Sequence, residues 1–333
     1  MKNRVSSFWQ TPRSYSVPGH LVKPGKNVIT SMVIDVLGAG GLWGGMQPEM
    51  SLQLAKFESK KINLSGSWRY LAESAIKIPP QPRNPHRLQG NPGFLFNAMI
   101  SPLVKFPITG VIWYQGESNA SRAHQYQRLF PAMIQDWRIR WQQGNFPFYF
   151  VQLANYHTRK SLPGDSAWAE LREAQLMTLR LPNTGMAVII DIGEAKNIHP
   201  KNKQDVGRRL AFNALASHYS QSMESCGPIY AKMSIKNGHI VLSFIHAGSG
   251  LIAKGSNGKL KGFTIAGKDK KFFNAEAEIE NGKVAVWSSQ VKEPIAVRYG
   301  WADNPKCNLY NKEQLPATPF RTDNWAGITI GNM

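Results

Sequence analysis

VIWYQGESNA, residues 111–120, decides the fold class of this chain. Apolar and aromatic residues that favour strands run directly into Gln-Gly-Glu-Ser-Asn at 115–119. A strand that ends in such a cluster of hydrogen-bonding side chains is typical of the functional edge of an open α/β sheet, where ligands bind. The alternative is a polar turn whose side chains satisfy only their own backbone.

Strands and helices alternate around this stretch. Short apolar runs predict strands, and apolar residues at steps of three and four predict helices. The predicted strands are 110–114, 147–153 and 186–191, and the predicted helices are 122–142, 167–181 and 200–219. Asp165 or Ser166 suits the N-cap of the helix predicted at 167–181. Pro200 suits the first turn of the helix predicted at 200–219. The alternation predicts an α/β fold with a parallel, doubly wound sheet and flanking helices.

The pattern of residues predicts three parts. Residues 1–58 are rich in Gly and Pro and contain short β-like pieces, including a Pro-Gly turn followed by a strand. Residues 59–222 form the α/β domain, which begins with a Pro-rich linker or surface excursion. Residues 223–333 form a β-rich C-terminal domain, in which Asn-Gly pairs predict hairpins within 233–246 and 277–289.

The net charge of +19 sets the chain apart from an average globular protein. A basic surface can attract nucleic acid, acidic lipid or an acidic sugar. Lys and Arg are spread along the chain, without zinc-ligand spacing or an RNA-binding signature beside them. Nucleic-acid binding is therefore disfavoured, although charge keeps it open as a third reading that a steep salt dependence would reveal.

Other compositional features narrow the class further. No apolar run reaches the ~18 residues that a membrane span needs. The basic N-terminus lacks the apolar segment of a signal peptide. Two cysteines, Cys226 and Cys307, do not make a disulfide framework, although one bridge could form outside the cytosol.

A second polar cluster follows the last predicted strand, in IIDIGEAKNIHPKNK at 189–203. Asp191 ends the strand, and His199 precedes a helix, whose dipole disfavours an imidazolium there. A neutral histidine can act as a general base, and a nearby carboxylate can fix its tautomer. The alternative is a surface histidine near a helix cap. Two polar clusters at strand ends of one sheet favour a hydrolase site.

The chain resembles the sialate O-acetylesterase family of the SGNH hydrolase superfamily over nearly its whole length. The blocks that carry the resemblance are LFNAMISPL (95–103), GVIWYQGESNA (110–120), RLFPAMIQDWRIRW (128–141), FPFYFVQLANY (146–156), WAELREAQ (168–175), LPNTGMAVIIDIGE (181–194), DIGEAKNIHPKNKQDVGRRLA (191–211) and AVRYGWADNPKCNLYN (296–311). RSYSVPGHLVKPGKNVI (13–29) resembles the tail of the galactose-binding-like β-domain that bacterial members carry. The resemblance implies an SGNH-hydrolase-like sheet between that β-domain remnant and the β-rich end.

The resemblance also implies a serine esterase that acts on acetylated sugars without a cofactor or a metal. His199 would be the catalytic base, and Gln115 would donate to the oxyanion. Asp191 or Glu194 would orient His199, although position 196 is Lys where the superfamily's Asp-x-x-His pattern has Asp. The substrate-binding residues would be Glu117, Asn119 and Asn97. A periplasmic or secreted location is expected for the family.

The chain departs from the family at the nucleophile. The family's nucleophile block, Gly-Gln-Ser-Asn-Met, is absent. The family's second block is a Ser-Trp-Gly-Gly-Thr-like glycine loop, which LWGGM at 42–46 matches only weakly. We therefore expect the C-terminal part of a longer enzyme, weakly active or inactive alone, with its N-terminal half encoded upstream. Ser118 is the alternative nucleophile, although it lies in no Gly-x-Ser-x-Gly elbow. The competing hypothesis is a non-catalytic, carbohydrate-binding remnant of the same fold.

Overall fold

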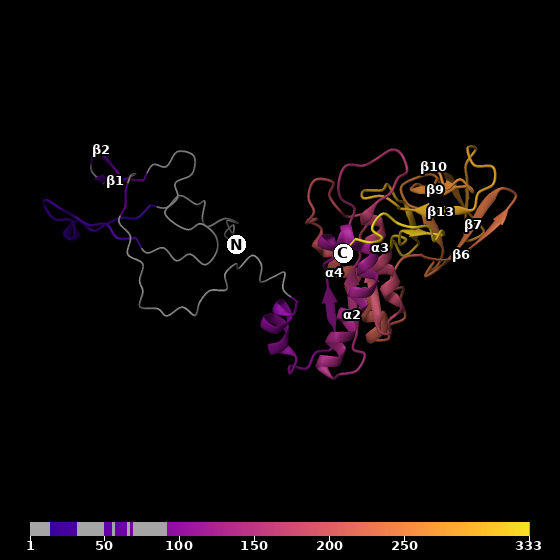
Figure 1. The fold of residues 1–333 in the computed structure, drawn as a ribbon, viewed down its shortest axis with the longest axis horizontal. Coiled ribbons are helices and arrows are strands. Elements are labelled where there is room, and N and C mark those ends of the chain that lie inside the picture. The colour runs from indigo at the N-terminus through magenta and orange to yellow at the C-terminus, as the bar shows by residue number, and fades with distance from the viewer. Residues whose placement is uncertain (1–13, 32–49, 55–56, 65–66, 69–91, 333) are drawn as a thin grey trace. The chain divides into compact units, whose positions relative to one another are not determined.

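The computed structural model describes residues 14–31, 50–54, 57–64, 67–68 and 92–332 (Figure 1). The chain divides into two compact units, Met1–Ser101 and Pro102–Met333. The domain boundary predicted at residue 58 falls inside strand β2 (Phe57–Asn63) of the first unit.

The first unit contains little regular structure in its described part. β1 (Ser51–Leu54) and β2 form an antiparallel hairpin, and the helical turns are Gly19–Leu21 and Phe96–Ile100. Residues 26–31, where the sequence predicts the start of a strand, form none. LWGGM lies outside the described residues. A single hairpin does not define a galactose-binding-like domain, so that assignment stays a prediction.

A parallel sheet organises the first half of the second unit. Its order is β3-β4-β5, with β3 at Val111–Trp113, β4 at Phe148–Val151 and β5 at Thr184–Ala187. The parallel α/β prediction is thus confirmed. All four residues of the central strand β4 are buried, as expected for a strand covered on both faces. β5 begins two residues earlier than predicted and ends before Val188–Ile190, which are buried outside the ladder.

Three α-helices flank this sheet (Figure 1): α2 (Ala123–Trp141), α3 (Ala167–Met177) and α4 (Lys203–Asn213). Shorter helical turns lie at Ser101–Leu103, Glu117–Arg122, Thr178–Arg180 and Ala214–His218. The predicted cap Ser166 is confirmed, because its hydroxyl accepts a hydrogen bond from the N–H of Ala169. Pro200 is not in the first turn of α4, because Asn202 caps that helix and the helix begins at Lys203.

Residues 229–321 form antiparallel strands, and the two hairpins predicted within 233–246 and 277–289 are among them. One sheet has the order β11-β12-β7-β6, another β10-β9-β13-β15, and β14 pairs with β8. Their bounds are β6 Ile229–Lys236, β7 His239–Ile245, β8 Leu251–Ala253, β9 Phe263–Ala266, β10 Phe272–Asn274, β11 Glu276–Glu280, β12 Lys283–Trp287, β13 Ala296–Tyr299, β14 Leu309–Asn311 and β15 Phe320–Arg321. Asn237-Gly238 and Asn281-Gly282 both have positive φ, as the two-residue hairpin turns require.

These strands enclose a core of their own, which includes Ile240, Leu242, Ile265 and Val284. Figure 1 shows the antiparallel strands at one end of the second unit and the chain's C-terminus back beside α3. Cys226 and Cys307 are both free thiols, so they do not form the bridge considered above.

Candidate active site

The parallel strands send three polar segments out of one edge of the sheet. Because β3, β4 and β5 run in the same direction, their carboxyl ends share that edge. Residues 115–122 follow β3, residues 152–166 follow β4, and residues 188–202 follow β5. Gln115 and His199 therefore lie on segments that leave the same edge, on either side of the β4 segment.

Tyr126 fixes the Gln115 side chain. The Tyr126 hydroxyl donates to Gln115 Oε1 at 3.2 Å. Burial, together with the negative charge of Glu117, raises the pKa of Tyr126, so its hydroxyl stays protonated and acts as the donor. Gln115 Nε2 has no hydrogen-bond partner among the described residues. This amide nitrogen is free to donate to a ligand.

Gln175 of α3 ties the ends of β3 and β4 together. This fully buried amide accepts from the N–H of Leu153 at 2.9 Å and donates to the carbonyls of Val151 and Gln115 at 3.2 and 3.4 Å. A Cβ on Gly116 would lie 3.0 Å from Gln175 Nε2. The close packing explains why the segment after β3 carries a glycine there.

Glu117, Ser118 and Asn119 lie in the helical turn Glu117–Arg122. Burial and the negative charge of Glu117 raise the pKa of Tyr114 to about 12. Ser118 is exposed, and within the described part of the chain it makes no hydrogen bond to an imidazole. Asn97 lies in the first unit, in the π-helical turn, so its role in substrate binding stays a prediction.

His199 lies on a loop that is held by its own side chains. Asn197 Oδ1 accepts from the N–H of His199 at 3.0 Å, and Glu194 Oε1 accepts from the N–H of Lys201 at 2.8 Å. The loop is thereby shaped without the imidazole, which is exposed and has no hydrogen-bond partner in the described residues. Glu194 Oε2 also has no hydrogen-bond partner among the described residues.

Asp191 is bound by groups other than His199. Its two oxygens accept from Arg209 at 2.6 and 2.7 Å, and Oδ2 also accepts from the Tyr310 hydroxyl at 3.0 Å. Burial alone would lower the pKa of Arg209, but the hydrogen bonds and charge of Asp191 more than offset it and raise the pKa overall. Asp191 therefore connects the segment after β5 to α4 and to β14.

Two contacts bring the β3 and β5 segments together. The ammonium of Lys203 lies 4.6 Å from the ring centroid of Tyr114, as a cation–π pair. Tyr114 and Ile192 also pack against the same buried cluster. The start of α4, which follows His199, is thus in contact with the residue that precedes Gln115.

Two positioning residues were missed by the sequence reasoning. Asn155 joins the loops after β4 and β5, because its Oδ1 accepts from the N–H of Gly193 at 2.7 Å. Arg172, fully buried, donates to the carbonyls of Leu153, Ala154, Ala302 and Asp303 at 2.7–2.9 Å. Burial lowers its pKa to about 10. The only signal in the sequence was their presence in blocks of the family resemblance.

Neither a metal centre nor a membrane span is found in what the structure describes. No group of three or more His, Cys, Asp or Glu side chains in the described residues could hold a metal ion. Among the same residues, no helix combines the length and the apolar character needed to cross a bilayer.

The fold and this edge define the class as an α/β protein whose polar site lies at the carboxyl end of a parallel sheet. Residues 88–216 match the family model described as a carbohydrate esterase, sialic acid-specific acetylesterase. This match, together with the relatives below, supports the assignment of the chain to the sialate O-acetylesterase family of carbohydrate esterases.

Individual relatives agree with this family. The sialate O-acetylesterase of Mus musculus is 31% identical over 252 residues, which cover 68% of this chain and 46% of the mouse protein. The Homo sapiens sialate O-acetylesterase is 29% identical over 309 residues, covering 84% of this chain and 58% of the human protein. The chain thus spans about half the length of these curated relatives.

A solved structure is also similar to this chain. The crystal structure of a carbohydrate acetylesterase from Xanthomonas citri matches with a TM-score of 0.66 and 47% identity. The match covers 69% of this chain and 54% of the Xanthomonas chain.

Proposed function

We propose that this chain supplies the base and the oxyanion donor of an esterase that removes O-acetyl groups from sialic acid or a related sugar. The observation that carries the proposal is the pair of unpartnered groups at one sheet edge, Gln115 Nε2 and the His199 imidazole. The names of the mouse, human and Xanthomonas relatives support the substrate class.

In the proposed reaction, a serine hydroxyl attacks the acetyl carbonyl while His199 takes up its proton. Gln115 Nε2 donates to the oxyanion of the tetrahedral intermediate. The intermediate collapses, and the departing sugar oxygen takes the proton from His199. Water then attacks the acetyl-serine with His199 again as the base, so that acetate leaves and the serine is restored. Glu117 and Asn119 are assigned to substrate binding.

We assign the orienting carboxylate to Glu194 instead of Asp191. Glu194 Oε2 is unpartnered in the described residues and lies on the same loop as His199. Asp191 instead accepts from Arg209 and Tyr310. This choice takes one of the two carboxylates, Asp191 and Glu194, that the resemblance left open.

The nucleophile, on this proposal, lies outside these 333 residues, in a Gly-Gln-Ser-Asn-Met block on a separate N-terminal half. The chain alone would then be weakly active or inactive. Ser118 is less well supported because it is exposed and has no imidazole partner in the described part.

The test is acetate release from O-acetylated N-acetylneuraminic acid. The full chain is assayed alone and after mixing with the portion of the Xanthomonas acetylesterase that it does not cover. We expect activity in the mixture, a loss on the order of a million-fold in turnover for His199→Ala, and a loss of about 10²–10³ for Gln115→Ala. Activity in the mixture that survives both substitutions would contradict the proposal.

A further inference from the structure

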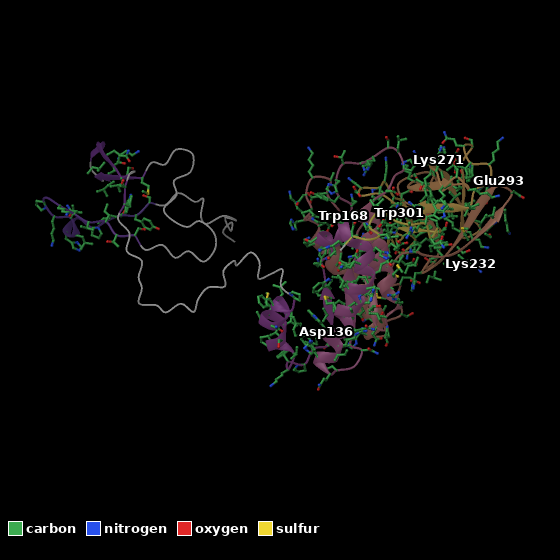
Figure 2. All side chains as sticks on the ribbon, in the orientation of Figure 1. Asp136, Trp168, Lys232, Lys271, Glu293 and Trp301 are labelled. Carbon is green, nitrogen blue, oxygen red and sulfur yellow. The ribbon has the colours of Figure 1, made fainter. Side chains whose placement is uncertain are left out.

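The end of the chain returns from the antiparallel strands to the helices of the parallel sheet. Residues 322–332, here called the C-terminal tail, follow β15, and Figure 1 shows the chain end beside α3. Arg321, just before the tail, donates to both oxygens of Glu173 on α3 at 2.7 and 2.8 Å. Its guanidinium also lies 5.1 Å from the ring centroid of Trp301, labelled in Figure 2. The start of the tail is therefore anchored to α3 and to Trp301.

A buried carboxylate on α3 holds the far part of the tail. Glu170 is only 6% exposed, and its Oε1 accepts from the N–H of Ile328 at 2.7 Å. Its Oε2 accepts from the N–H of Thr329 at 3.1 Å and from the Thr329 hydroxyl. A Cβ on Gly327 would lie 2.5 Å from this carboxylate, so a larger residue there would displace it. Hydrogen bonds to a carboxylate are stronger than those between neutral groups, so the tail is held in one place at this point.

The Thr329 hydroxyl passes this restraint on to α2. A carboxylate only accepts hydrogen bonds, so the hydroxyl donates to Glu170 and keeps its lone pairs for other donors. It accepts from the N–H of His124, the second residue of α2, at 3.0 Å. The N–H groups of a first helical turn have no partner inside the helix, and Arg122 before α2 makes no side-chain cap. The tail therefore supplies the cap from 205 residues further along the chain.

The helical turn that the tail caps also holds Gln115. Tyr126, in the first turn of α2, donates to Gln115 Oε1, and this bond leaves Gln115 Nε2 free to face a ligand. Asn332 Nδ2 makes a second tail contact, because it donates at 2.9 Å to the carbonyl of Ser121 in the turn Glu117–Arg122. Both tail contacts thus fall on the segment between Gln115 and Tyr126.

We propose that Thr329 is a positioning residue for the oxyanion donor. It acts through the first turn of α2 and through Tyr126, which together keep Gln115 in the orientation that a tetrahedral intermediate requires. The inference rests on the proposed function, because it explains how the donor of that reaction is held. It also extends the site to the end of the chain, since a segment that follows the β-rich part sets the geometry of a group at the sheet edge.

The first test compares variants of Thr329 in the acetate-release assay with the Xanthomonas portion. Thr329→Val removes the hydroxyl with little change of shape. We expect kcat to fall by about 10- to 100-fold with KM unchanged, because a misplacement of about 1 Å has effects of that order. Thr329→Ser keeps the hydroxyl and should restore most of kcat.

The matched control is Thr318→Val. Thr318 and Thr329 are equally buried, each 1% exposed. The Thr318 hydroxyl, however, has no hydrogen-bond partner among the described residues. This control should therefore keep the kcat of the unmodified chain.

The second test needs no nucleophile and uses the full chain alone. The side-chain NH₂ signals of Gln115 are followed by ¹⁵N NMR and assigned by their absence in Gln115→Ala. Thr329→Val should shift these signals and speed hydrogen exchange of the His124 N–H, whereas Thr329→Ser and Thr318→Val should do neither. Asn332→Ala removes the second contact at an exposed position, where folding is little affected, and should shift the same signals by a smaller amount.

Two results would overturn the positioning role. One is unchanged Gln115 signals in both Thr329→Val and Asn332→Ala. The other is a Thr329→Val variant that unfolds at a lower temperature but keeps the kcat of the unmodified chain, because the tail would then only stabilise the fold. A mixture that releases no acetate even with the unmodified chain would contradict the proposed function instead, and the NMR comparison would still decide whether the tail holds Gln115.

Discussion

The backbone N–H of Gly193 donates a 2.7 Å hydrogen bond to the side-chain oxygen of Asn155. This bond joins the loop after β4 to the loop that carries His199. A Cβ at position 193 would overlap the carbonyl oxygen and the side-chain oxygen of Asn155, so the approach requires glycine. The position of His199 thus depends on a contact between neighbouring strand ends.

Gly193→Ala should destabilise the fold by about 1–3 kcal/mol, because overpacking of a tight contact forces the loop to move. Thermal unfolding measures the effect. The matched control is Gly207→Ala in α4, where an added Cβ meets nothing within 4 Å. That change should be neutral or stabilise by up to about 1 kcal/mol, because alanine favours a helix. Equal stability of both variants would contradict the role given to the Gly193–Asn155 contact.

Asp191→Asn and Glu194→Gln should separate a structural carboxylate from an orienting one. The Asp191 and Arg209 side chains are only 15% and 7% exposed. Removing one charge from such a pair costs about 3–5 kcal/mol. Glu194→Gln keeps an oxygen for the N–H of Lys201 and should leave the free energy of unfolding almost unchanged, while it lowers kcat in the mixture. A stable Asp191→Asn variant with no activity would reverse the two assignments.

Tyr126→Phe should release the Gln115 amide. The lost hydrogen bond costs about 1 kcal/mol of stability, and rotation of the amide should lower kcat more than it changes KM. Tyr219→Phe is the control, because Tyr219 is 61% exposed and far less constrained. If Tyr126→Phe left kcat unchanged, Gln115 would not be held for catalysis by this hydroxyl.

The free energy of unfolding should fall at alkaline pH because the two buried thiols ionise. Burial raises the pKa of Cys226 to about 11 and that of Cys307 to about 12, from an ordinary value near 9. Because the folded state holds the thiol protons more tightly than the unfolded state, the protonated thiols stabilise the folded state. This stabilisation is fully present below pH 9 and is lost as the pH rises through 11 to 12. Urea unfolding at pH 8, 9 and 10 should show a declining free energy, and Cys307→Ala should flatten the slope. A slope that is equally steep in the variant would exclude the thiol as its source.

The sequence predicts the local helices and strands of this fold better than it predicts contacts between residues far apart in the chain. Periodicity and Asn-Gly pairs suffice for α2 and for the β6–β7 hairpin. The end of β5 is misjudged, because Val188–Ile190 are as buried as a strand but lie outside the ladder. Apolar content alone cannot distinguish these two environments.

The charged residues of α3 show the same limit. Arg172 bonds to Ala302, 130 residues away, and Glu170 accepts from the N–H groups of Ile328 and Thr329, which lie still further along the chain. Helical periodicity gives no sign of such partners. For the site, the polar residues at the strand ends could be named from the sequence, but the engagement of Asp191 by Arg209 could not, because it depends on how α4 packs.

The most direct test of the central claim is to identify the serine that His199 activates. A fluorophosphonate probe labels activated serines, and mass spectrometry locates the label. In the mixture of this chain with the uncovered portion of the Xanthomonas acetylesterase, we predict labelling of a serine on the added portion that disappears with His199→Ala, and no labelling of Ser118. Labelling of Ser118 in the chain alone, abolished by His199→Ala, would contradict the claim that the nucleophile lies outside these residues.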